Sequence, residues 1–213
     1  MAPVRALLLT RAESGAGSIG RCRPNVDSNP LLAMDTRLFS DRSVWTMIHG
    51  IVLGGAALMA LAAALFSLRA MRTVDSSAVA AHDQSRYVAW LVVFAAAALW
   101  LTVIIGTYVN FPPYRATPPE GLTDLSQYPR SLIQSNPGTV WLHAFAMESK
   151  EHVPWIAAML ATAVAFVAAR YRSKLLTDMR LNGMATTLLL ICFVLASLVG
   201  VLGIFINKVA PLE

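Results

Sequence analysis

The chain has little charge for its length. Only 14% of its 213 residues are Asp, Glu, Lys or Arg, whereas 56% are hydrophobic. Soluble domains carry about 25% charged residues, and a soluble fold this apolar would expose large patches that aggregate. The shortage of charge therefore excludes an ordinary soluble globular protein and indicates a chain that meets lipid.

Cysteine and the familiar catalytic motifs are also scarce. The two cysteines, Cys22 and Cys192, lie in a polar segment and inside an apolar run, so we expect neither a disulfide nor a cysteine metal site. The chain has no phosphate-binding glycine-rich loop, no Gly-x-Ser-x-Gly turn and no His-Glu-x-x-His motif. The net charge of +5 comes without a nucleic-acid-binding motif. We therefore expect no nucleic-acid partner, and no enzyme activity from this chain on its own.

Four long hydrophobic runs dominate the sequence. They predict helices over residues 44–68, 88–109, 153–171 and 184–206. A helix needs roughly 20 apolar residues to cross the hydrocarbon core of a bilayer, and continuous rather than alternating hydrophobicity favours helices over strands. The sequence thus predicts an all-α integral membrane four-helix bundle over residues 44–213, with the lipid bilayer as a partner.

The first 43 residues differ from the rest of the chain. They are polar, carry several arginines and are rich in Gly, Ser and Pro, a composition that predicts a disordered extension. The apolar piece at residues 6–9 is too short for a signal-peptide core. Met34 is an alternative natural start, which would leave only a short segment before the first helix.

The segments between the runs differ in charge. Loops 69–87 and 172–183 are short and basic, whereas loop 110–152 matches its basic residues with acidic ones. The positive-inside rule therefore places the two basic loops in the cytoplasm and loop 110–152 outside. The arginines of the N-terminal extension argue for the opposite orientation. We predict a protein of the bacterial inner (plasma) membrane with a long extracytoplasmic loop between its second and third helices.

Loop 110–152 is rich in proline and aromatic residues. Pro112 and Pro113 are expected to end the second helix, and further prolines predict an irregular segment after them. Loops this long are usually functional or disordered, and the aromatic content argues against disorder. A helical pattern returns over residues 139–152 and predicts a short helix there. We expect the loop to fold over the outer end of the bundle.

Three of the four histidines are predicted at this outer face. His49 lies near the outer end of the first helix, and His143 and His152 flank the start of the third. Ionisable groups at membrane depth are costly and often mark function, and neutral imidazole is a good ligand for iron, copper or zinc. His49 and His152 fit the axial ligands of one haem b, with His143 as an alternative ligand. A single transition metal is the other form of this hypothesis, with these ligands: His49, His143, Glu148, Glu151 and His152.

Three functions stay open at this point. The first is a haem- or metal-binding electron-transfer component that works with other membrane or redox subunits, by analogy with small helical subunits of respiratory enzymes. The second is a non-catalytic structural or assembly subunit, in which the histidines and carboxylates tie the loop to the bundle. The third is a quinol-interacting protein in which His143 or Glu151 accepts protons near the outer face. The fourth histidine, His82, is predicted in a solvated loop on the other side.

Overall fold

A computed structural model describes residues 40–70 and 78–210. These residues are helical with short irregular connections, and none of them forms a strand. The predicted disordered extension lies outside the described residues up to residue 39. The first helix begins at Asp41, because the Ser40 side chain accepts a hydrogen bond from the Ser43 N–H and caps it.

Four continuous helices are long and apolar enough to cross a membrane, which confirms the predicted number. The first consists of α1 (Asp41–Met47), the π-helical η1 (Ile48–Gly54) and α2 (Gly55–Ala70). The second consists of α3 (Ala78–Ile105), π-helical η2 (Gly106–Asn110) and α4 (Phe111–Tyr114). The third joins π-helical η3 (Leu142–Met147) to α6 (Glu148–Arg170), and the fourth is α8 (Met179–Val209). Two short helices, α5 (Pro129–Gln134) and α7 (Arg172–Thr177), lie in the connections.

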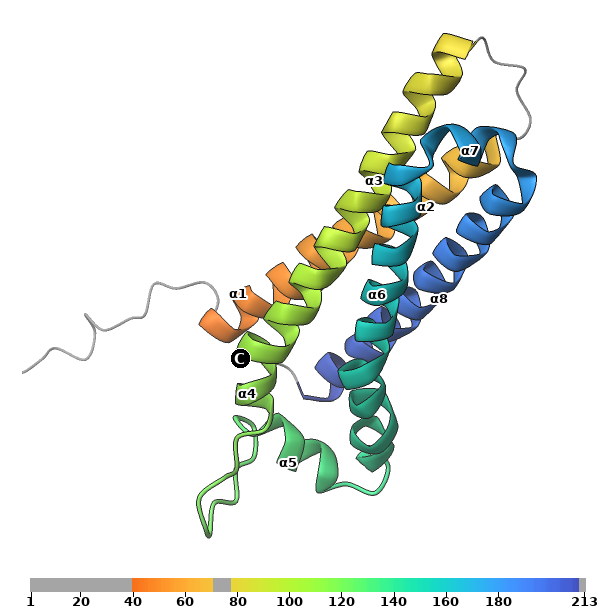
Figure 1. The fold of residues 1–213 in the computed structure, drawn as a ribbon. Helices are drawn as coiled ribbons and strands as arrows, with labels where there is room; N and C mark the ends of the chain where they lie inside the picture. Colours follow the sequence, from red (N-terminus) through yellow and green to blue (C-terminus); the bar gives the residue numbers. More distant parts are fainter. Residues whose placement is uncertain (1–39, 71–77, 211–213) are drawn as a thin grey trace, which may run out of the picture. The chain divides into compact units, whose positions relative to one another are not determined.

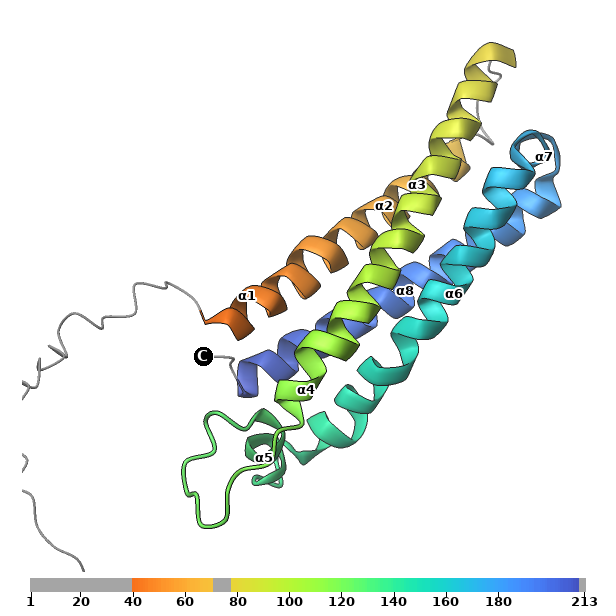
Figure 2. The ribbon, with the colours of Figure 1, turned by 60° about the vertical axis from the view of Figure 1, so that its left-hand side comes forward.

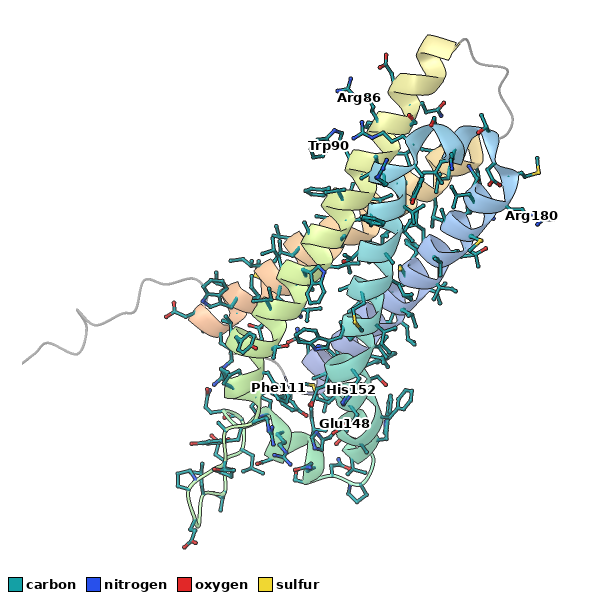
Figure 3. The ribbon with its side chains drawn as sticks, viewed as in Figure 1. Arg86, Trp90, Phe111, Glu148, His152 and Arg180 are labelled. Carbon is teal, nitrogen blue, oxygen red and sulfur yellow. The ribbon has the colours of Figure 1, made fainter. Side chains whose placement is uncertain are left out.

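The four helices alternate in direction and pack in a ring. Helix α2 contacts α3 and α8, and α6 contacts the same two helices from the other side. Figures 1 and 2 show α4 and α5 at one end of this bundle and α7 at the other. We call these the loop end and the arginine end. Figure 3 shows Phe111, Glu148 and His152 toward the loop end and Arg86 and Arg180 at the arginine end.

The interior of the bundle is lined with small residues, and large apolar residues face outward. Alanines such as Ala57, Ala64 and Ala161 are fully buried, whereas Met59 is 75% exposed and Phe66 is 76% exposed. This distribution is the reverse of that in a soluble protein. It fits helices that pack closely through small residues while their large side chains face lipid.

All four membrane-length helices begin before their approximate predicted starts, and the difference matters most in the second and fourth. Helix α3 begins at Ala78 rather than residue 88, so His82 lies on a helix and not in a loop. Helix α8 begins at Met179 rather than residue 184, because the Asp178 carboxylate accepts hydrogen bonds from the N–H groups of Arg180 and Leu181. Hydrophobicity marks only the apolar part of a helix, whereas good helix-forming residues and caps extend it into polar sequence.

The predicted loop 110–152 also contains more helix than expected. The second helix continues through Pro112 and Pro113 and ends at Tyr114, so the two prolines lie in its last turn and not beyond its end. Pro129 begins the unpredicted helix α5, where a missing N–H leaves no hydrogen bond unmade. The predicted short helix over residues 139–152 is continuous with the third membrane-length helix, so the irregular segment between α4 and η3 is interrupted only by α5.

Candidate functional site

The π-helical segments gather toward the loop end. Segments η1, η2 and η3 lie in the loop-end parts of the first three membrane-length helices. A π-helical turn contains an extra residue, which widens the helix and re-aims nearby side chains, and such turns are frequent at functional sites. The loop end is therefore the part of the bundle whose local structure departs most from plain helix.

His49 lies on η1 and points into the bundle toward the second helix. A Cβ atom placed on Gly106 of η2 would lie 2.7 Å from Cε1 of His49, so only glycine leaves room for this imidazole. The ring also reaches the backbone of Thr102, one turn before Gly106. Its Nδ1 atom is buried and has no hydrogen-bond partner within the described structure. His49 thus presents an unpaired ring nitrogen within the first membrane-length helix.

Lys150 reaches the same region from the third helix. A Cβ atom placed on Gly203 of α8 would lie 3.2 Å from the Lys150 Nζ, so the ammonium group lies against α8. Lys150 and His49 interact electrostatically, and no residue that the structure describes gives Lys150 a hydrogen bond or an ion pair. Pro154, four residues on, cannot donate the N–H that would normally pair with the Lys150 carbonyl. We call His49 and Lys150 the polar pair.

Two further polar atoms beside the polar pair are left unsatisfied. Thr46 precedes His49 by one turn on the first helix, and Asn110 follows Gly106 by one turn on the second. The Oγ1 atom of Thr46 and the Nδ2 atom of Asn110 are buried without a partner among the described residues. Leaving a buried polar atom unpaired costs about 1–3 kcal/mol. A ligand or water that hydrogen-bonds to these atoms would relieve that cost.

A second polar cluster lies closer to the end of the bundle. The Tyr114 hydroxyl and Nδ1 of His143 share a hydrogen bond of 2.9 Å, which ties α4 to η3. Tyr114 is buried, and it lies within electrostatic range of Arg130, Glu151 and Glu148. We call this set of five residues the tyrosine cluster.

His152 has a different environment from the other two predicted site histidines. It is exposed, and its Nδ1 donates a hydrogen bond of 2.9 Å to the Glu148 carbonyl one turn earlier. Residues two apart on a helix point about 200° apart, so His152 projects from the side of α6 opposite to Lys150. No contact among the described residues joins His152 to His49, and His152 lies on the outside of its helix.

The predicted metal ligands are therefore divided between several places. No three His, Cys, Asp or Glu side chains among the described residues lie close enough to hold a metal ion. His143 and Glu151 belong to the tyrosine cluster, His49 belongs to the polar pair, and His152 faces outward. The haem and metal assignments stay predictions.

Sequence reasoning missed Lys150 and Tyr114. Lys150 was not among the predicted site residues, although the helical pattern from residue 139 runs without a break into the third hydrophobic run. That continuity was the available signal, because it places the lysine on a helix of membrane-spanning length. Nothing in the sequence pairs Tyr114 with His143, which lie 29 residues apart.

Comparison with known proteins finds no significant match: no family model, no curated protein and no solved structure is similar to this chain.

Proposed function

We propose that this chain is an integral membrane subunit that binds the head group of a quinone or quinol between its helices at the loop end. The observation that carries this proposal is the polar pair, two ionisable side chains on membrane-length helices that lie within electrostatic range of each other, with no counter-charge for Lys150 among the described residues. Ionisable groups at such positions are costly and usually serve function. Gly106 and Gly203, which have no side chains, leave the space that the His49 imidazole and the Lys150 ammonium group occupy.

The chemistry of the polar pair suits a quinone head group. A quinone oxygen accepts hydrogen bonds, and the Lys150 ammonium offers three N–H donors on a flexible stem. A neutral imidazole has one donor and one acceptor nitrogen, so His49 can donate to the Thr102 backbone and use its unpaired Nδ1 to accept a hydrogen bond from a quinol hydroxyl. The unsatisfied atoms of Thr46 and Asn110 extend the same polar surface. Quinones dissolve in the bilayer and reach such a site from the side.

The tyrosine cluster provides a route for protons. Oxidation of a quinol releases two protons and two electrons, and the electrons pass to a metal or haem centre of a partner redox subunit. His143, hydrogen-bonded to Tyr114, and the nearby Glu151 and Glu148 supply protonatable groups between the polar pair and the loop end. We propose that the loop end faces the outside of a bacterial inner membrane, since the arginine end carries the excess of basic residues.

A quinone titration tests the proposal. Purified protein in lipid nanodiscs is titrated with a short-chain ubiquinone and a short-chain menaquinone, and quenching of tryptophan fluorescence is followed. We expect saturable binding of one of them. His49→Leu and Lys150→Met should each weaken it about tenfold or more, because a hydrogen bond to a charged group contributes about 1.5–3 kcal/mol. The matched control is Lys208→Met, because Lys208 is an exposed lysine on α8. Unsaturable quenching, or equal affinity in all variants, would reject the proposal.

A haem b or a single transition metal is the second candidate. It is favoured by His152 and His143, each of which has Nδ1 engaged in a hydrogen bond and therefore leaves Nε2 free. This is the usual state of a histidine ligand, whose second nitrogen is held by another group. Optical spectra of the oxidised and dithionite-reduced protein test it, together with elemental analysis. Absence of a Soret band and of bound metal would exclude this candidate and leave the quinone proposal untouched.

A further inference from the structure

An apolar groove opens on the outside of the bundle toward the arginine end, far from the polar pair. It has a volume of about 270 Å³ and is lined by Leu65, Phe66 and Arg69 of α2 and by Thr186 and Leu190 of α8. Leu65 and Arg69 are one turn apart, as are Thr186 and Leu190, so the two helices face each other along parallel ridges. Its volume is just below the roughly 300–1,000 Å³ of typical small-molecule pockets. A volume of this size suits part of a long alkyl chain better than a complete compact ligand.

The groove is apolar along its walls and cationic at its end. Phe66 is 76% exposed and forms an outward wall, and Leu190 is 44% exposed. Arg69 lies in the last turn of α2, is exposed, and has no ion-pair partner among the residues that the structure describes. A long alkyl chain with an anionic head is the ligand that matches this combination.

The surrounding surface has the same sign of charge. The described cations on the helices that end here outnumber the acids six to two: Arg69, Arg86, Arg170, Arg172, Lys174 and Arg180 against Asp83 and Asp178. The Asp178 carboxylate is already engaged as the cap of α8. Figure 3 shows Arg86 and Arg180 at this end. Basic pockets between membrane helices on the cytoplasmic side are typical sites for anionic lipid head groups.

We infer that this groove binds one anionic phospholipid, with an acyl chain between α2 and α8 and the phosphate on Arg69. The inference rests on membrane insertion but not on quinone binding. Thr186 uses its hydroxyl to donate a hydrogen bond of 2.8 Å to the Asn182 carbonyl. Its methyl group therefore remains for the acyl chain. The lipid would join the first and last helices at the arginine end.

Native mass spectrometry tests this inference. The protein is placed in nanodiscs that contain equal amounts of phosphatidylglycerol and phosphatidylcholine. It is then released from them in the mass spectrometer, and the lipids that stay bound to it are counted. We expect one phosphatidylglycerol per chain. Arg69→Gln should lower its retention about fivefold, equivalent to ~1 kcal/mol for one basic side chain near an anionic surface. Leu190→Trp, which fills the groove and keeps Arg69, should abolish retention of that lipid.

The control is Arg180→Gln, which removes a charge from the same end but outside the groove. Retention close to that of the unaltered protein in this variant supports a defined site. Equal loss in Arg69→Gln and Arg180→Gln would overturn the inference in favour of diffuse attraction. Equal retention of the two lipids would also overturn it. So would a dimer of this chain that Leu190→Trp destabilises, because a second copy rather than a lipid would then occupy the groove. Quinone affinity should be unchanged in Leu190→Trp, so failure here is distinguishable from failure of the proposed function.

Discussion

The imidazole of His49 occupies the space that a side chain at Gly106 would fill. A Cβ atom at Gly106 would lie 2.7 Å from the His49 Cε1 atom, closer than real side chains approach. This contact joins the π-helical segments of the first and second helices. The orientation of His49 therefore depends on Gly106, a residue without a side chain.

Replacing Gly106 by alanine should therefore displace His49. Alanine normally stabilises a helix by roughly 0.5–1 kcal/mol relative to glycine, and that gain is expected for Gly50→Ala, because a Cβ at Gly50 meets no atom within 4 Å. At Gly106 the clash should cancel the gain and weaken quinone binding by tenfold or more. Thermal unfolding in nanodiscs and the quinone titration measure the two effects. Equal changes in unfolding temperature and in quinone affinity for Gly50→Ala and Gly106→Ala would contradict the contact between Gly106 and His49.

Lys150→Met should stabilise the protein while it weakens quinone binding. Burying an ionised group without a partner is costly, so we expect a gain of about 1 kcal/mol or more in the free energy of unfolding, and Lys150 has no partner among the described residues that would lose a hydrogen bond. The measurement is the unfolding midpoint in the absence of ligand. Lys208→Met provides the comparison at an exposed site, where little change is expected. A clear loss of stability in Lys150→Met would indicate a structural rather than a functional lysine.

Tyr114→Phe should loosen the link between α4 and η3. The variant removes one hydrogen bond of 2.9 Å to His143 and keeps the buried ring, so we expect a loss of about 1 kcal/mol. Hydrogen–deuterium exchange should become faster in η3 and unchanged in α8. The stacked Phe111 ring, 6.2 Å from that of Tyr114, offers the matched control Phe111→Leu, which leaves the hydrogen bond in place.

Besides the Tyr114–His143 bond, a hydrogen bond between α3 and α6 joins the second and third helices. Nε1 of Trp100 donates to Oγ1 of Thr162 at 2.9 Å, and the Trp100 ring meets Trp155 edge-on with centroids 5.7 Å apart. A double-mutant cycle with Trp100→Phe and Thr162→Val should give a coupling of about 0.6 kcal/mol, the average for such bonds in membrane proteins. A coupling near zero would mean that the bond does not form in the bilayer.

The orientation of the bundle has a direct labelling test. Ser126 lies in the segment between α4 and α5, and Ser173 lies on α7. A cysteine replacing Ser126 should react with a membrane-impermeant maleimide in intact cells, and a cysteine replacing Ser173 should react only after lysis. Replacing Cys22 and Cys192 by serine and alanine removes the native thiols first. The reverse pattern would place the arginine end outside.

The sequence by itself determined the number of membrane-length helices. It also indicated that three histidines and a long aromatic loop lie at the same end of the bundle. Hydrophobic run length is a local property, since one helix in lipid satisfies its own backbone, so no tertiary contact is needed to predict it. The histidines could be assigned to one face because antiparallel helices return each loop to a known side. The continuation of helix through Pro112 was less predictable, because it depends on the turn that precedes the proline.

Only the tertiary structure decided which polar residues meet. Facing side chains are set by rotation about each helix axis, and each residue added by a π-helical turn shifts that rotation by about 100°. A run that is apolar on all sides does not indicate which side of its helix faces the interior, so this rotation cannot be predicted from hydrophobicity. The structure placed Lys150 within electrostatic range of His49, whereas His152 is exposed and bonds to its own helix. It also showed that Gly106 and Gly203, which looked like ordinary small residues in the sequence, are where those two side chains find space.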